Sequence, residues 1–241
     1  KSMNLSVGEN KAYIVVFHPN GEDFTRYELS LYRLDMKEYS FVVDGEVYQS
    51  GTVEEPSSVE APTIDPQKTG YDFVGWTVNG ENVSFPYQMR MECIFEAKFT
   101  PIEYSISYDT YVSENPETFT VEDLPLQLAA PEVGENQTFA GWCETYDLSD
   151  EPSMQITSLG DVNLYAKIAE CTDGLIFVDF GNVCSVSDYK GTSANVVIPS
   201  FNNGKKVTSI GNYVFYNCTS LKSIEIPESV KTFGTYSFYN C

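Results

Sequence analysis

Basic side chains are scarce in this sequence. Its 14 Lys and Arg residues stand against 35 Asp and Glu residues, which gives a formal net charge of −21 at pH 7. Such an excess of negative charge repels nucleic acid phosphates and anionic membrane surfaces. The composition therefore argues against nucleic acid as a partner.

No Lys or Arg at all occurs between Phe99 and Ala166, although acidic residues accumulate there. We interpret this stretch as a solvated face that keeps the protein in solution. An acidic docking surface or a loose calcium site is the alternative.

Histidine is almost absent, because His18 is the only one. This excludes metal sites made of several histidines and leaves one imidazole for a Ser-His or Cys-His pair. His18 stands beside Pro19 in a predicted turn, where we expect an ordinary exposed side chain. The chain also lacks the G-x-S-x-G, Walker, H-E-x-x-H and G-x-G-x-x-G motifs.

A pair of buried carboxylates, as in glycosidases, would leave no such motif and stays open as an alternative. The repeats described below are too small for a deep cleft, however. We therefore expect no catalytic residue, no metal and no cofactor, and predict that the chain is not an enzyme.

Long apolar runs are missing as well. No run of about 18 apolar residues occurs, so we predict no membrane-spanning helix and no direct membrane insertion. The opening residues do not resemble a signal peptide, and the sequence stops at Cys241 within a repeating pattern. We expect a piece of a longer exported protein.

Six cysteines are present, and none forms a C-x-x-C pair. Cys218 and Cys241 share one position of a repeat described below, and we expect both to be core thiols. Cys171 and Cys184 are the one pair for which a disulfide deserves a test, and the sequence leaves that pairing open.

One long segment occurs twice in the chain. The only two tryptophans, Trp76 and Trp142, end matching Phe-x-Gly-Trp sequences. Each unit alternates like a strand at its start, as in Tyr104–Tyr108, and closes on a strand such as Val162–Ala166. We expect the motif's glycine to form a bulge or admit a second backbone, and its Phe and Trp to supply much of a small core.

This pattern resembles the internalin-type B-repeat, also called the Listeria-Bacteroides repeat. The centre of that repeat stands here as Gly70–Trp76 and, less completely, as Gln137–Trp142, and its closing as Phe95–Lys98 and Leu164–Lys167. The second unit carries Cys143 where an aromatic residue is usual. The resemblance implies a small β-grasp-like fold, used as a tandem spacer in secreted or wall-anchored bacterial proteins.

A second, shorter repeat follows near the end of the chain. Leu221–Ile226 fits the L-x-x-L-x-L signature of a leucine-rich repeat, and the pattern of Ser209–Cys218 recurs as Thr232–Cys241. The offset between the two copies lies within the range of about 20 to 29 residues for leucine-rich repeats. The order Ile-Pro, Ser-Ile-Gly, Phe-Tyr-Asn-Cys resembles the BspA-like leucine-rich repeats of bacterial surface proteins.

The first residues fit neither repeat well. Tyr13–Phe17 and Tyr27–Tyr32 are predicted strands, joined by a turn at His18–Gly21. They could form an N-terminal hairpin, a repeat reduced to its first and last strands, or the tail of an upstream domain.

We therefore predict a mainly β (α+β) chain, in which tandem β-grasp-like units precede a short leucine-rich-repeat solenoid. Thr100–Glu103 leaves little slack between the two units, so we expect a semi-rigid stalk. The predicted segments are residues 1–36 (hairpin or degenerate repeat), 37–102 (B-repeat unit 1), 103–170 (B-repeat unit 2) and 171–241 (start of the BspA-like array).

Tyrosines at equivalent positions of the shorter repeat are the best candidates for a binding surface, because exposed tyrosine offers rigid contact area at low entropy cost. The alternative is that they only seal the solenoid around a core phenylalanine. The candidates are Tyr213, Tyr216, Tyr236 and Tyr239.

The resemblances imply a non-catalytic protein at the bacterial surface, secreted or associated with the cell wall. Its expected partner is a host or bacterial surface macromolecule, protein or glycan, bound in adhesion. The alternative is a carbohydrate-binding accessory module of a larger secreted protein, with the tyrosines as sugar platforms.

Overall fold

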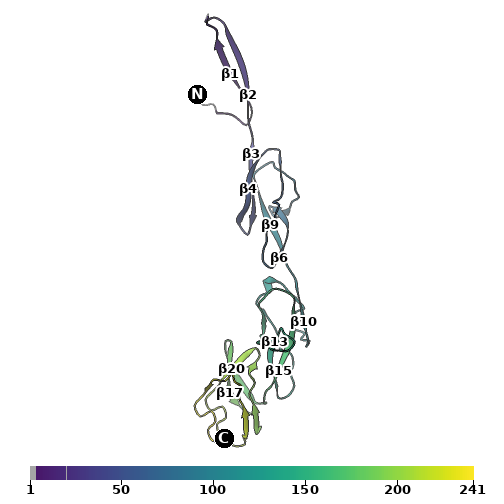
Figure 1. Ribbon diagram of the computed structural model, residues 1–241, viewed down its shortest axis with the longest axis vertical. Coiled ribbons are helices and arrows are strands. Elements are labelled where there is room, and N and C mark those ends of the chain that lie inside the picture. Colours follow the sequence, from purple (N-terminus) through teal and green to yellow (C-terminus); the bar gives the residue numbers. More distant parts are fainter. Residues whose placement is uncertain (1–3, 20) are drawn as a thin grey trace. The chain divides into compact units, whose positions relative to one another are not determined.

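A computed structural model describes residues 4–19 and 21–241 (Figure 1). Its regular elements are β-strands, apart from one 3-10 turn at Val121–Asp123. The mainly β prediction is confirmed, but the described ranges contain no α-helix, so the α part of the expected class is wrong. Prolines in the connections of both repeats explain this, because proline lacks the amide hydrogen that a helix interior needs. They include Pro56, Pro62 and Pro66 in the first repeat and Pro116, Pro125 and Pro131 in the second.

The chain divides after Thr100 into two compact units. The first unit contains an antiparallel hairpin, a five-stranded sheet in the order β4-β3-β9-β6-β7, and a small pair, β5 with β8. Its strands are β1 (Gly8–Phe17), β2 (Phe24–Arg33), β3 (Met36–Val43), β4 (Glu46–Glu54), β5 (Ser58–Val59), β6 (Tyr71–Val78), β7 (Glu81–Asn82), β8 (Tyr87–Gln88) and β9 (Cys93–Pro101).

The hairpin consists of β1 and β2, which confirms the two strands expected there. Paired residues join them along their whole length, from Gly8 with Arg33 to Phe17 with Phe24. In the five-stranded sheet, by contrast, the opening strand β3 and the closing strand β9 run parallel. The core of this repeat is aromatic, since Phe41 lies 4.7 Å from both Trp76 and Phe95, centroid to centroid.

The second unit opens with a repeat of the same plan. Its sheet has the order β11-β10-β15-β13, and the opening strand β10 again pairs parallel with the closing strand β15. A small pair, β12 with β14, belongs to the same repeat. The strands are β10 (Tyr104–Tyr108), β11 (Thr118–Phe119), β12 (Leu126–Gln127), β13 (Gln137–Cys143), β14 (Gln155–Ile156) and β15 (Val162–Glu170).

The Phe-x-Gly-Trp motif has one geometry in both repeats. The rings of Phe73 and Trp76 lie 5.4 Å apart at 66°, and those of Phe139 and Trp142 lie 5.3 Å apart at 68°. Both tryptophans are buried, 4% and 2% exposed. Residues three apart in a regular strand point to opposite faces. The motif must therefore break the alternation to bring Phe and Trp together.

A β-bulge at the motif's glycine breaks it. The register of β13 against β15 shifts between Phe139 and Gly141, so one extra residue fits into β13. The φ angles of Gly75 and Gly141 are 135° and 142°, a region that other residues rarely enter. This confirms the bulge expected from the sequence.

Only Gly141 also admits a second backbone. A Cβ atom there would lie 2.8 Å from Cβ of Pro152 and 3.2 Å from Cα of Gly204, whereas a Cβ at Gly75 would meet nothing within 4 Å. The difference arises because the chain after residue 170 packs against β13. The amides of Asn203 and Gly204 donate to the carbonyls of Phe139 and Ala140, each at 2.7 Å.

The rest of the second unit contains two ladders of parallel strands. In one, β17, β20 and β22 pair parallel, with β16 and β19 added antiparallel; in the other, β18 pairs parallel with β21. Ser209 pairs directly with Thr232, its equivalent in the next copy of the shorter repeat. The strands are β16 (Leu175–Phe180), β17 (Val183–Tyr189), β18 (Asn195–Val197), β19 (Phe201–Asn202), β20 (Lys205–Ile210), β21 (Ser223–Glu225) and β22 (Thr232–Phe233).

The core of this segment is formed by residues from both ladders and the turns that follow them, among which Val186, Val196, Val207 and Phe215 are all at most 1% exposed. The segment is also joined to the repeat before it. Thr172, which follows that repeat, donates its amide to the carbonyl of Val197 and accepts the Val197 amide on its hydroxyl.

The two motif glycines give a matched test of this packing. We predict that Gly75→Ala costs about 1–3 kcal/mol of stability through backbone strain alone. Gly141→Ala adds crowding against Pro152 and Gly204, which raises the loss by roughly a further 1–3 kcal/mol. Hydrogen exchange with mass spectrometry, resolved by unit, measures each loss separately. Equal losses for the two variants would contradict the close approach at Gly141.

Candidate binding surface

Four exposed tyrosines gather on the turns that follow β20 and β22. The rings of Tyr213 and Tyr236 lie 5.6 Å apart at 27°, and those of Tyr216 and Tyr239 lie 5.3 Å apart at 12°. Within each turn the rings meet nearly at right angles, 73° for Tyr213 with Tyr216 and 90° for Tyr236 with Tyr239. We call these four residues the tyrosine array.

The buried phenylalanine of each turn fixes the array. Phe215 is 0% exposed and stacks on Phe238 at 5.3 Å and 9°. In each turn one tyrosine lies two residues before this phenylalanine and the other directly after it. The phenylalanine points into the core, and the four tyrosines are left 42–54% exposed.

Backbone hydrogen bonds hold the two turns in register. The Tyr213 amide donates to the carbonyl of Thr235 at 3.0 Å, and the Phe215 amide to that of Ser237 at 2.8 Å. Asn212 adds a side-chain contact, because its Oδ1 accepts the Thr235 amide at 2.6 Å. These bonds space the tyrosine pairs by one strand-to-strand step.

The first tyrosine of each turn adopts an uncommon backbone conformation. The φ angles of Tyr213 and Tyr236 are 60° and 55°, in the left-handed region that favours glycine and asparagine. Such residues cost about 1–3 kcal/mol each and tend to cluster at functional sites. The same strained tyrosine recurs in both turns, so the fold maintains it.

Stacking determines which parts of the rings face solvent. Each ring has one near-parallel neighbour and one perpendicular neighbour within the array, so neighbouring rings cover part of its faces. Ring edges and phenol hydroxyls remain accessible, and each hydroxyl can donate and accept a hydrogen bond. A sugar platform, by contrast, needs a free aromatic face.

The array also lies on the least charged part of the chain. Residues 171–241 contain five acidic and five basic side chains, so the whole net charge of −21 comes from residues 1–170. Long-range repulsion by this segment is therefore weak, and an acidic or a basic macromolecule can approach it.

Comparison with protein-family models explains both repeats. The model of the Listeria-Bacteroides repeat domain matches residues 39–93 and 104–167, and that of the BspA type leucine rich repeat region matches residues 190–241. The chain carries two Listeria-Bacteroides repeat domains and a BspA type leucine rich repeat region. Among curated proteins, no relative matches the chain.

These assignments confirm both resemblances seen in the sequence. The two families suggest a bacterial surface repeat protein, and such repeat families are typically non-catalytic. The tyrosine array lies within the BspA type region, and both buried tryptophans lie within Listeria-Bacteroides repeat domains.

The remaining candidates for chemistry are not brought together. His18 is exposed, and its Nε2 lies 3.1 Å from the hydroxyl of Thr25 in the hairpin. In the part of the chain that the structure describes, no three His, Cys, Asp or Glu side chains gather as a metal site. The same residues include no helix with the length and apolar character of a membrane span.

The six cysteines are free thiols. Cys171 and Cys184, the pair left open above, are both buried and do not form a disulfide. Cys218 is half-buried, but Cys241 is exposed, so the expectation of a core thiol at Cys241 is wrong. No further turn of the described chain covers Cys241.

Burial raises the pKa of three of these thiols. The pKa values of Cys143, Cys171 and Cys184 rise from 9.0 to about 11, with desolvation as the largest cause, followed by a nearby aspartate in each case. At neutral pH these thiols are protonated, and a thiol is a poor nucleophile in that form. They act as core residues.

The raised pKa of Cys184 predicts a loss of stability at high pH. The folded state holds the proton more tightly than the unfolded state, so this contribution is complete below pH 9 and is lost as pH rises from 9.0 to about 11. Urea unfolding across this range measures the slope. Cys184→Ala should flatten it and Cys241→Ala should not. An unchanged slope in Cys184→Ala would contradict the assignment.

Proposed function

We propose that this chain is a non-catalytic segment of a secreted or cell-wall-associated bacterial protein that binds a host or bacterial surface macromolecule. In this proposal the Listeria-Bacteroides repeats are β-grasp-like spacers, and the BspA type region is a short leucine-rich-repeat solenoid that presents the tyrosine array. The family assignments support the surface setting, and the array supports the binding role.

The tyrosine array is the observation that carries the binding role. Tyrosine is enriched where proteins recognise one another, because a rigid ring supplies contact area and a hydroxyl supplies a polar contact. Four such residues share one surface, and Tyr213 and Tyr236 keep a strained backbone there. Sealing the core does not require this strain, because Phe215 and Phe238 already fill the interior position.

Protein is the better supported partner class. The accessible ring edges and hydroxyls suit the side chains and backbone groups of a protein surface. Sugar binding by aromatic stacking needs a free ring face, and the rings of the array partly cover one another. The role of carbohydrate-binding accessory module is therefore the less supported alternative.

Paired substitutions test the binding role. We predict that Tyr213→Ala/Tyr236→Ala weakens binding to immobilised extracellular-matrix proteins by roughly 30-fold, because a central tyrosine contributes about 2 kcal/mol. Biolayer interferometry with the intact chain measures this affinity.

Tyr111→Ala/Tyr146→Ala is the matched control, since these tyrosines are 81% and 84% exposed and lie outside the array. It should bind like the parent chain. A glycan array probed with the same variants separates the alternatives: sugar binding that disappears only in the array variant would favour the carbohydrate module. Equal binding by all variants in both assays would contradict a role for the array.

A further inference from the structure

The hairpin of β1 and β2 has two chemically different faces. Directly paired residues share a face, and successive residues of a strand alternate between faces. The register therefore separates the hairpin's side chains into two sets. One set, which we call the charged face, includes Glu9, Lys11, Arg26 and Glu28. The other, the apolar face, includes Ala12, Ile14, Val16, Tyr27, Leu29 and Leu31.

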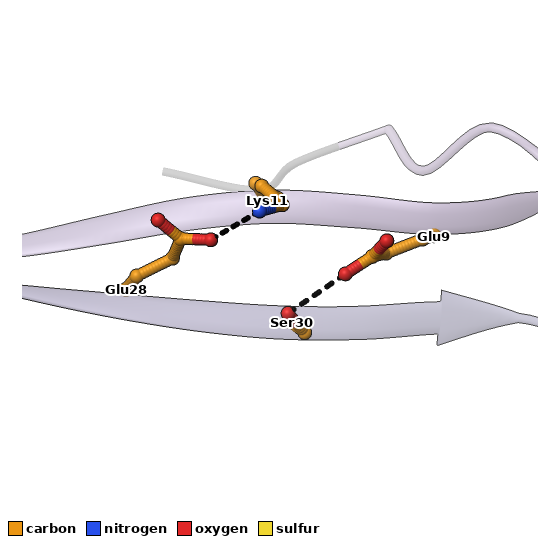
Figure 2. Close-up of polar contacts among 4 residues, drawn as sticks. All are labelled: Glu9, Lys11, Glu28 and Ser30. Atoms are coloured by element: carbon orange, nitrogen blue, oxygen red, sulfur yellow. Dashed lines mark hydrogen bonds and ion pairs between the residues drawn. The ribbon is translucent and has the colours of Figure 1, made fainter.

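The polar groups of the charged face find partners within the hairpin. Lys11 forms an ion pair with Glu28, and the Ser30 hydroxyl donates to Glu9 at 2.9 Å (Figure 2). The Arg26 guanidinium lies 4.0 Å from the centroid of the Tyr13 ring. This face is suited to water.

The apolar face has polar contacts only at its base, among the residues that the structure describes. There Arg33 donates to the carbonyl of Leu5 at 2.8 Å, and Asn10 exchanges two hydrogen bonds with the backbone of Ser6. Beyond them Ile14 and Val16 are each 50% exposed, and Tyr27 is 55% exposed. Within residues 4–19 and 21–241, β1 and β2 form a sheet of two strands only.

A hairpin of two strands is marginal in water, and it needs a hydrophobic face packed on something else to become stable. The charge of this hairpin favours a second copy as the covering element. The two strands hold three basic and two acidic residues, in a chain of net charge −21. Both acids lie on the charged face, so the apolar faces of two copies can meet without bringing carboxylates together.

We propose that the apolar face of this hairpin pairs with the same face of a second copy of the chain. A two-fold arrangement with the hairpins antiparallel makes the contact self-complementary. It also places the two Arg33 side chains, the only charged groups of this face, at opposite ends. The four strands then form a small sandwich with the charged faces outward.

The size of the face predicts weak pairing. At about 3.4 Å per residue each strand makes a face about 34 Å long, and two strands make it about 10 Å wide. Two such faces bury roughly 700–1,000 Å², which is below the roughly 1,200 Å² of standard interfaces. We therefore expect a reversible dimer at high micromolar concentration.

Sedimentation equilibrium of the intact chain tests the proposal with two adjacent valines. Val16 lies on the apolar face and Val15 on the charged face, and they are 50% and 42% exposed. The parent chain and Val15→Lys should dimerise with similar dissociation constants, whereas Val16→Lys should weaken the dimer at least about 10-fold, equivalent to about 1.4 kcal/mol.

A gentler pair of variants guards against unfolding of the hairpin. Ile14→Thr/Leu29→Thr removes apolar area while keeping residues that favour strands. It should weaken the dimer, whereas Val15→Thr should not, and hydrogen exchange of the hairpin amides verifies that both hairpins stay folded. A parent chain that stays monomeric throughout the micromolar range, or equal dimerisation by variants of both faces, would overturn the proposal.

Discussion

The β-bulge at the glycine of Phe-x-Gly-Trp is the constraint on which each repeat depends. A regular strand would send Phe and Trp to opposite faces because they are three residues apart. The extra residue at the bulge places Phe139 and Trp142 in one core, with the same ring geometry as Phe73 and Trp76. So small a unit has little other apolar material, and this pair therefore supplies a large share of the buried area.

Sequence alone predicts this core but not what surrounds it. The motif names the aromatic pair and the glycine, because the bulge is a local feature. The motif reads Phe-x-Gly-Trp around both Gly75 and Gly141, yet only Gly141 lies against another backbone. That contact arises when Asn203 and Gly204 pair with β13, and no local pattern specifies a partner so distant in the sequence. The absence of helix was also missed, since the prolines of the connections outweigh the α+β expectation.

The tyrosine array was predictable for a related reason. Equivalent residues of a repeat stack when parallel strands align their turns, so a regular period is enough to bring the four tyrosines together. The left-handed backbone of Tyr213 and Tyr236 and the perpendicular rings within each turn were not predictable, because they depend on how Phe215 packs. The same logic of stacking failed at Cys241, where no next turn of the described chain covers the thiol.

The most direct test of the account replaces each tryptophan by alanine in the intact chain and follows hydrogen exchange in every strand. The account predicts that Trp142→Ala removes protection from β10, β13 and β15, and also from β19, which packs on β13, while β3, β6 and β9 keep theirs. Trp76→Ala should expose β3, β6 and β9 and leave the second unit protected. Loss of protection through the whole chain in either variant, or retained protection around the substituted residue, would contradict the dependence of each repeat on its own aromatic pair.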